Sequence, residues 1–399
     1  MSKGNIKRIF DEGNGVLHLT PTWVPRPFNE PGKRLRLHPD DYFALGMNRG
    51  AVTERWFGSI TRADNGPDTG EYEAMSFVWD GSEKKKILFL DFVEELKEQL
   101  VGEELQGKYG GWPTYAKFFD NNKPLFHHLH LTEEDAMRIG RHGKPEAYYF
   151  PVQYNNHMGS FPYTFFGFDP SASKEEIIEC LKNYTVRDTR ITELSRAYRI
   201  KLGTGWYVPG GVIHAPGSVL TYEPQWNSDV NTIFENVTAG EVNNLRLLTG
   251  CTPKEEQNDM EAIFRQLNWE ESTRADFKEK YFRPPVLLPV SHKGLSEKWI
   301  VYANEWIAAK EVTVMPKSEV LLKDKACYCA IAVQGFGRFG SFNCEAPILI
   351  RYETITSDEF FVSEKAAKEG IVIRNDSSVE PLVILQNFAN NNVDVPVEV

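Results

Sequence analysis

The sequence predicts a mainly β protein with two β domains and a helical segment between them. Aromatic residues make up 13% of its 399 residues, and such side chains pack well on pleated surfaces. Most of the chain consists of short runs with alternating apolar residues, separated by turns rich in Gly, Pro, Asn and Asp; KLGTGWYVPGG and EGIVIRN are examples. This pattern is typical of strands that bury one face against a core.

Three segments interrupt the strand pattern and are expected to form helices. Each begins with a residue that caps helices and has a glutamate three positions later. The segments are DFVEELKEQL from Asp91, SKEEIIECLKNY from Ser173, and TPKEEQNDMEAIFRQLNW from Thr252. The third also carries Pro253 at the first helical position, which favours the start of a helix.

These segments suggest a division of the chain into three parts. Residues 1–240 are expected to form an N-terminal β domain with helical insertions. Residues 241–282 are expected to form a helical connector, and residues 283–399 a second, C-terminal β domain. The pair Pro284 and Pro285 marks the joint between the connector and the second domain.

Composition argues against several classes of partner. A net charge of -11 disfavours binding to nucleic acid or to an anionic membrane. No run approaches the roughly 18–20 apolar residues of a membrane helix, and the segment MSKGNIKRIFDEGNG lacks the apolar core of a signal peptide. The five scattered cysteines indicate free thiols in a reducing cytoplasm. The spacing of Cys327 and Cys329 could bind a metal, but alternation within a strand explains it better.

Histidines near residue 130 and a later glutamate form the strongest chemical signal. In a strand, residues two apart share a face, so His128 and His130 project together from HHLHL. Glu146 follows a turn-rich loop in GKPEAYYF, and His214 follows a Pro-Gly-Gly turn in YVPGGVIHAPG. Three imidazoles and one carboxylate from separate strands could hold one divalent metal ion. If the pair His128 and His130 is considered alone, the alternative is that both are ordinary polar residues of a strand and bind no metal.

The order H-x-H, then Glu, then P-x-G-x-x-H in a β-rich chain resembles the signature of the cupin jelly roll, a small barrel whose mouth holds a metal. Fifteen residues separate His130 from Glu146, more than in ordinary cupins. Type I mannose-6-phosphate isomerases have such a loop, and the chain is similar to them over about residues 85–235. The motifs that agree in order are HHLHL, GKPEAYYF, SKEEIIECLKNY, YVPGGVIHAPG and QWNSD.

This resemblance implies two cupin domains with a helical insertion and connector, the first domain binding metal. It also implies roles for individual residues: the metal ligands His128, His130, Glu146 and His214, the catalytic residues Lys144 and Glu223, and the substrate-binding residues Gln225, Asn227 and Asp229. The family's first ligand is glutamine, and the imidazole of His128 should bind a transition metal more firmly. One divalent ion is therefore expected, Zn²⁺ first, with Mn²⁺, Fe²⁺, Ni²⁺ or Co²⁺ as alternatives.

The activity that the resemblance implies is aldose–ketose isomerisation of a sugar or sugar phosphate. In such a reaction a proton moves between adjacent carbons while the metal polarises the carbonyl. Lys144 would stabilise the developing negative charge, and Glu223 or His157 would move the proton. Ile233 stands where the family has an arginine, and an apolar side chain can hold neither an enediolate nor a phosphate. Two other functions stay open: a carbohydrate-binding or regulatory cupin without catalysis, and an Fe(II) dioxygenase.

The C-terminal β region resembles a second cupin roll without a metal site. No histidine follows His292, so the same ligand set cannot form there. A structural role fits this region, for example in packing or in a homodimer. Aromatic residues near the motifs could stack on a sugar or pack the barrel. Trp226 lies between Gln225 and Asn227, so alternation turns its ring away from the side that these two residues share.

Overall fold

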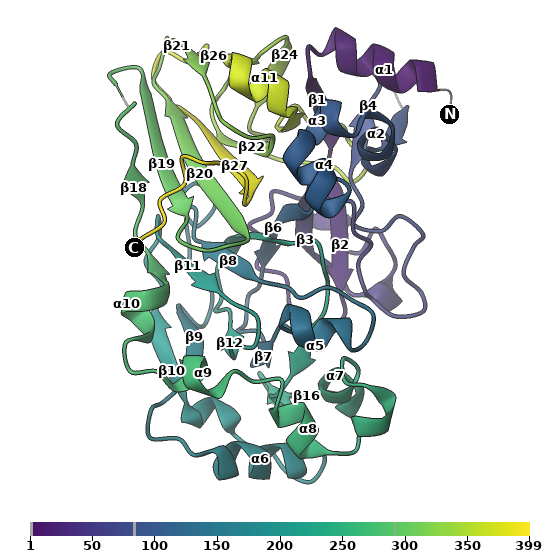
Figure 1. Ribbon diagram of the computed structural model, residues 1–399, viewed down its shortest axis with the longest axis vertical. Coiled ribbons are helices and arrows are strands. Elements are labelled where there is room, and N and C mark those ends of the chain that lie inside the picture. The colour runs from purple at the N-terminus through teal and green to yellow at the C-terminus, as the bar shows by residue number, and fades with distance from the viewer. Residues whose placement is uncertain (1–2, 83–84, 291) are drawn as a thin grey trace.

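The protein is a stack of antiparallel sheets with short helices around them, as the computed structural model in Figure 1 shows. The structure describes residues 3–82, 85–290 and 292–399. Five strands form the first sheet of the stack; in spatial order they are β10 (Ser195–Arg199), β9 (Tyr163–Phe168), β12 (His214–Ala215), β7 (His128–Leu129) and β14 (Thr232–Ile233). The mainly β class expected from the sequence is confirmed.

A seven-stranded sheet faces the five-stranded sheet. Its strands, in spatial order, are β17 (Phe282–Arg283), β11 (Gly205–Val208), β8 (Glu146–Tyr149), β13 (Leu220–Trp226), β6 (Thr114–Asp120), β3 (Ala51–Phe57) and β2 (Thr22–Arg26). Aromatic side chains fill part of the space between the two sheets; the rings of Tyr148 and Phe166 lie 5.8 Å apart. The jelly roll that carries the metal motif therefore consists of these two sheets.

Two further sheets form the other half of the stack. The nine-stranded sheet contains β18 (Val286–Leu287), β19 (Leu295–Val301), β20 (Ile307–Val314), β27 (Leu382–Ala389), β22 (Tyr328–Gln334), β25 (Glu359–Val362), β1 (Val16–Thr20), β4 (Phe77–Trp79) and β5 (Lys86–Leu88). The four-stranded sheet contains β21 (Glu319–Leu322), β26 (Ile371–Asn375), β23 (Phe336–Phe339) and β24 (Phe342–Glu345). The short strands β15 (Val237–Thr238) and β16 (Glu241–Val242) pair with each other.

The sheets do not separate at the boundary expected near residue 240. Strand β1 pairs with β25, with Val16 opposite Val362, and β4 and β5 extend the same sheet. A buried ion pair also crosses the two halves, because Arg55 on β3 lies 2.8 Å from Asp358. The division into 1–240, 241–282 and 283–399 stays a prediction, and the N-terminal strands add a pairing that it does not include.

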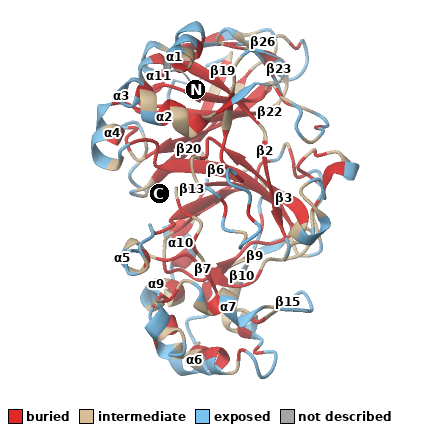
Figure 2. Ribbon diagram, turned by 90° about the vertical axis from the view of Figure 1, so that its right-hand side faces the viewer, coloured by how far each residue is buried: buried red, intermediate tan, exposed pale blue. Residues whose placement is uncertain are grey.

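The sequence pattern predicted strands that bury only one face, but strand β13 is buried on both faces. All seven of its residues are buried, as are most strand residues in the middle of the stack (Figure 2). Tyr222 and Trp226 belong to the large hydrophobic cluster that also contains Val301 and Leu385 of the nine-stranded sheet. Because the nine-stranded sheet covers this face, the opposite face of β13 turns toward the five-stranded sheet and the metal motif.

The helices are short and lie mainly at the two ends of the stack. They are α1 (Lys3–Glu12), α2 (Phe89–Leu96), α3 (Glu98–Val101), α4 (Glu103–Tyr109), α5 (Glu133–Met137), α6 (Lys174–Lys182), α7 (Leu245–Thr249), α8 (Met260–Phe264), α9 (Trp269–Thr273), α10 (Phe277–Tyr281) and α11 (Glu364–Glu369). The 3-10 helices are η1 (Pro39–Asp41), η2 (Met47–Arg49), η3 (Ile191–Leu194) and η4 (Lys254–Glu256).

Local capping signals had mixed success. Ser173 and Glu176 form the expected capping box at the start of α6. Helix α2 instead begins at Phe89, with Asp91 inside its first turn. The prediction of a single helix from Thr252 is wrong, because the segment forms η4 and then α8. Asp259 caps α8 by accepting a hydrogen bond from the backbone N–H of Glu261.

The cysteines and the helices bear on the thiol and membrane expectations. All five cysteines are free thiols. Cys329 lies in β22 and Cys327 directly before it, and both are buried in the large hydrophobic cluster. In residues 3–82, 85–290 and 292–399, no helix has both the length and the apolar character needed to span a bilayer.

Candidate metal centre

Three histidines meet between the five-stranded and the seven-stranded sheets. His128 lies on β7, His130 directly follows that strand, and His214 lies on β12. The register places His214 opposite His128 in adjacent strands. Ligand-capable nitrogen atoms of all three lie within 4.8 Å of one another. The H-x-H spacing and the P-x-G-x-x-H turn thus bring three buried imidazoles to one point.

Backbone carbonyls hold each of these imidazoles in one orientation. The Nδ1 atoms lie 3.0 Å (His128), 2.7 Å (His130) and 2.8 Å (His214) from the carbonyl oxygens of Phe126, Val230 and Val212. A carbonyl can only accept, so each Nδ1 carries the proton and each Nε2 keeps its lone pair. This arrangement is typical of histidines that bind a metal through Nε2.

Glu146 completes the group from the opposite sheet. It lies on β8 and is fully buried, and its Oε2 is 2.9 Å from Nε2 of His130. Its Oε1 is 3.1 Å from Nε2 of His214, yet within the described part of the chain neither atom has a hydrogen-bond partner. Two buried acceptors at this distance repel each other unless a cation lies against both. The residues present therefore fit a divalent metal ion.

Burial sets the protonation of this group. It lowers the pKa of His130 to about 4 and holds the pKa of His128 well below its ordinary value. Both imidazoles are therefore neutral near pH 7 and able to donate a lone pair to a metal. Burial also opposes ionisation of Glu146, but His130 and the Lys144 ammonium hold the pKa of that carboxyl well below its ordinary value.

Lys144 and Glu223 lie beside the candidate metal ligands. The Lys144 Nζ is 2.7 Å from Oε2 of Glu146, 3.0 Å from Nε2 of His130 and 3.3 Å from Oε1 of Glu223. Glu223 lies on β13 and is 2% exposed, and burial and the neighbouring Glu146 raise its pKa to about 8. Glu223 is thus paired with Lys144 and Lys117 inside the cavity.

A row of alternating charges continues from Glu223 along the seven-stranded sheet. Lys117 Nζ lies 3.1 Å from Glu223 and 3.8 Å from Glu54, and Arg26 lies 2.8 Å from Glu54. Sequence reasoning missed Lys117, Glu54 and Arg26. The available signal was a charged residue inside an apolar strand, in TYAKFFD for Lys117 and in AVTERWF for Glu54. These charges line a cavity of about 480 Å³ that also contains His128, His130 and Lys144.

The three expected substrate-binding residues do not share one location. Asp229 lines the metal cavity, where its carboxylate lies 3.4 Å from Arg26. Gln225 is fully buried and donates to the carbonyl of Ser228 at 2.9 Å. Asn227 lies beyond the end of β13 and lines a separate cavity, where it donates to the carbonyl of Trp112. Alternation along β13 ends at Trp226, so it no longer governs the direction of Asn227.

The remaining histidines lie outside the metal group. His157 is exposed and bonds to its neighbour Asn156, which removes it from the candidates for the proton carrier. His142 is exposed and bonds to Glu133. His127 is buried, with its ring 4.6 Å from that of Phe165.

Ile233 lines the same cavity as the candidate ligands His128 and His130. It is in β14, opposite His128, and is 1% exposed. Two arginines reach the rim of the same cavity from other segments: Arg141, which pairs with Asp64 at 3.0 Å, and the exposed Arg246 on α7. The cavity therefore has cationic groups although residue 233 is apolar.

Comparisons with solved structures identify the fold. The mannose 6-phosphate isomerase from Bacillus subtilis is similar over 94% of this chain and 99% of its own, with a TM-score of 0.64 and 17% identity. A variant of phosphomannose isomerase from Salmonella typhimurium is similar over 93% of this chain and 99% of its own, with a TM-score of 0.58 and 9% identity. No family model matches the sequence, and no curated protein matches it. The chain has the fold of mannose-6-phosphate isomerases, as its motifs implied.

Proposed function

We propose that the protein is a metal-dependent aldose–ketose isomerase that acts on a sugar phosphate. The observation that carries this proposal is the meeting of His128, His130, His214 and Glu146 beside the Lys144 ammonium. The cavity of about 480 Å³ that His128, His130 and Lys144 line is within the usual range for small-molecule sites, roughly 300–1,000 Å³. Three imidazoles and a carboxylate suit Zn²⁺, and the same ligands also accept Mn²⁺, Fe²⁺, Co²⁺ or Ni²⁺.

The residues of the cavity have distinct roles in such a reaction. The metal, when bound, would polarise the sugar carbonyl. A base removes the proton from C2 and returns it to C1, while the hydroxyl proton passes from O2 to O1. Glu223 would carry the carbon-bound proton, and Lys144, 3.3 Å from it, would stabilise the negative charge that develops on the oxygens. Lys117, which lies 3.1 Å from the same Glu223 oxygen that Lys144 contacts, would hold that carboxyl in position.

The experiment is proton exchange in deuterated water. The Zn²⁺- or Mn²⁺-loaded protein, incubated with an aldohexose 6-phosphate, is expected to introduce deuterium at C2 of the sugar and to form the ketose, both followed by NMR. Binding of the sugar phosphate without exchange would indicate the non-catalytic carbohydrate-binding protein instead. Oxygen consumption by the Fe²⁺-loaded protein would indicate a dioxygenase. A cytoplasmic location and a homodimer belong to the same proposal.

Arg246 is expected to recognise the phosphate group. Its side chain is exposed at the cavity rim, so it can approach an anion that Ile233 cannot hold. Arg246→Ala should raise KM for the phosphorylated aldose about tenfold, the effect of one charge-assisted hydrogen bond, and leave kcat unchanged. KM for the unphosphorylated sugar should not change. Arg265→Ala, an exposed arginine on another segment, is the control; an equal effect of both variants would refute this role.

A further inference from the structure

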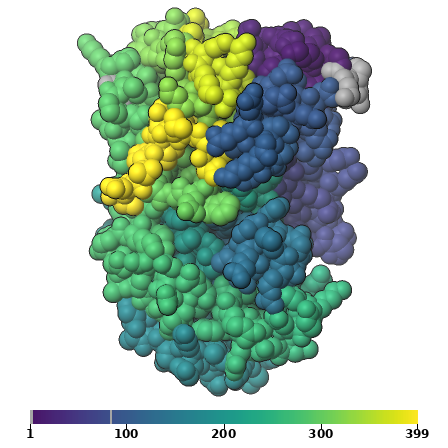
Figure 3. Space-filling view, in the orientation of Figure 1, coloured from purple at the N-terminus to yellow at the C-terminus, as the bar shows by residue number. Residues whose placement is uncertain are grey.

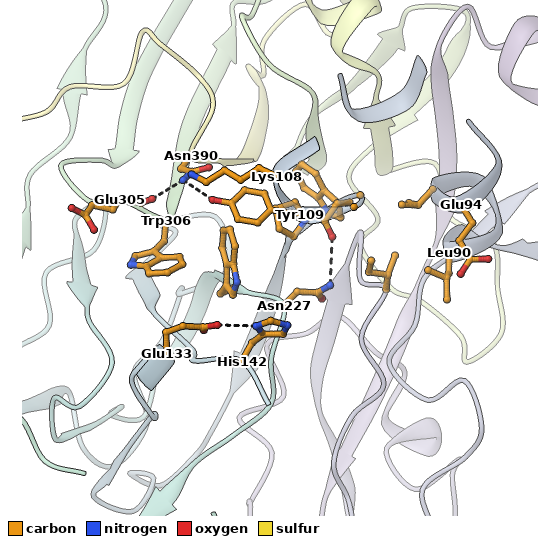
Figure 4. A pocket seen from close by; sticks show the side chains of 17 residues that line it. Leu90, Glu94, Lys108, Tyr109, Glu133, His142, Asn227, Glu305, Trp306 and Asn390 are labelled. Atoms are coloured by element: carbon orange, nitrogen blue, oxygen red, sulfur yellow. Dashed lines mark hydrogen bonds and ion pairs between the residues drawn. The ribbon is translucent and has the colours of Figure 1, made fainter. Parts of the chain in front are cut away.

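A second cavity lies on the other side of β13, between the two halves of the stack. Its volume is about 760 Å³. Segments that are distant in the sequence enclose it: the end of α4, the residues after β13, the loop before β20 and the end of β27 (Figure 4). Figure 3 shows the face of the molecule on which these segments come together. Among the described residues, none lines both this cavity and the metal cavity.

Aromatic rings form one wall of this cavity. Trp226 is flanked by Tyr109 and Trp306, each with ring centroids 5.0 Å from its own and in an edge-to-face arrangement. Tyr109 and Trp306 are half-buried, so part of each ring is free to contact a ligand. The faces of aromatic rings carry partial negative charge and attract the slightly positive C–H groups on the flat side of a sugar. Trp226 lines this second cavity together with Asn227, so the two residues do not lie on opposite sides as alternation predicted.

Polar groups stand around the aromatic wall in fixed positions. Glu133 is held by the N–H of Gly143, at 2.7 Å from its Oε2, and by His142, at 2.9 Å from its Oε1. Asn390 donates to the Tyr109 hydroxyl at 3.0 Å and to the carbonyl of Glu305 at 2.8 Å. Carboxylates and amides that are already oriented bind sugar hydroxyls with little loss of side-chain entropy.

The carboxylates of this cavity disfavour a sugar phosphate, the substrate proposed for the metal site. Glu94, Glu133 and Glu305 line it, against Lys108 and the imidazole of His142. A phosphate group would meet mostly carboxylates here. The Lys108 ammonium lies 5.0 Å from the centre of the Tyr109 ring, so a cation is already present beside this part of the aromatic wall. The aromatic wall and the oriented polar groups together match a neutral ligand with both hydroxyl groups and an apolar face.

We propose that this cavity is a second carbohydrate site, which binds a neutral saccharide between Trp306 and Tyr109 on one side and Glu133 on the other. The site is separate from the isomerase cavity and does not depend on the function proposed for it. Its ligand differs from the proposed substrate by having no phosphate, and its position between the two halves of the stack is common for small-molecule sites.

The experiment measures binding of sugars that cannot be isomerised. Methyl α-D-mannopyranoside, methyl α-D-glucopyranoside and methyl β-D-galactopyranoside have no free anomeric carbon and cannot open to an aldose. Calorimetric titration of the metal-loaded protein is expected to detect binding of at least one of them. Trp306→Ala should weaken this binding at least about tenfold, as expected for loss of an aromatic anchor. Glu133→Gln, which keeps the side-chain size, should weaken it too.

Two controls locate the site. Trp79→Ala removes another half-buried tryptophan, on β4, and should leave binding unchanged. Inorganic phosphate, which favours the cationic rim of the metal cavity, should not displace the glycoside. The proposal is overturned if none of the three glycosides binds, if both Trp306→Ala and Glu133→Gln bind as the unaltered protein does, or if phosphate competes. Deuterium exchange at the metal site is measured separately, so failure of one proposal does not imply failure of the other.

Discussion

Replacing His214 by alanine is expected to reduce metal affinity by more than about 100-fold and to abolish isomerase activity at limiting metal. His214 is fully buried, and its Nε2 lies 3.1 Å from Glu146. Its removal leaves three candidate ligands, and loss of even the groups that orient a metal's ligands commonly costs 10–100-fold in affinity. Metal content after dialysis, measured by atomic emission, gives the first readout, and kcat at increasing Zn²⁺ gives the second.

The matched control for His214→Ala is His157→Ala. His157 is exposed and its imidazole bonds to Asn156, and alanine keeps the backbone carbonyl that accepts from Arg34, so the substitution should change neither metal content nor kcat. Thermal unfolding of both variants shows whether the His214 variant is folded. If the folded His214 variant kept stoichiometric metal after dialysis, these histidines would not form the metal site.

Lys144→Met is expected to lower kcat by about 100- to 1,000-fold while metal content stays unchanged. The ammonium lies 2.7 Å from Glu146 and 3.3 Å from Glu223, at the point where charge would develop on the substrate oxygens. Loss of one such donor from a site that excludes water typically has this effect on kcat. Methionine preserves much of the side-chain volume, so packing of the cavity should change little.

Comparing the change in kcat with the change in KM distinguishes a catalytic role of Lys144 from a structural one. A residue that acts only on the developing charge lowers kcat and leaves KM nearly constant. Lys123→Met, which removes a lysine that is 44% exposed, is the control and should have no effect. An unchanged kcat in Lys144→Met, with metal bound, would remove Lys144 from the proposed mechanism.

The parts of the fold that followed from the sequence are those that depend on neighbouring residues. The capping box of Ser173 and Glu176 forms as expected because its hydrogen bonds span three residues. The segment after Thr252 failed for the opposite reason: Thr252 is buried and bonds to Gln266 in the tertiary structure, and the regular helix starts only after Asp259. Packing therefore overrode a capping signal that was correct by local rules.

In the candidate site, too, local features followed from the sequence and long-range ones did not. The H-x-H spacing in a strand determined that His128 and His130 share a face, because strand geometry alone sets that direction. The sequence could not show which charges would lie beside them. Lys117 and Arg26 reach the cavity because β6, β3 and β2 align in one sheet, and that register results from long-range pairing.

The sequence by itself determined the mainly β class, the isomerase-like order of motifs and the pair of histidines on one face. Only the tertiary structure decided that β1 joins the C-terminal sheet, that Asn227 and Trp226 line a second cavity, and that Lys117 faces Glu223. The physical reason is the range of the interactions. Periodicity and capping act within a few residues, whereas sheet order and cavities depend on contacts between segments that are far apart in the chain.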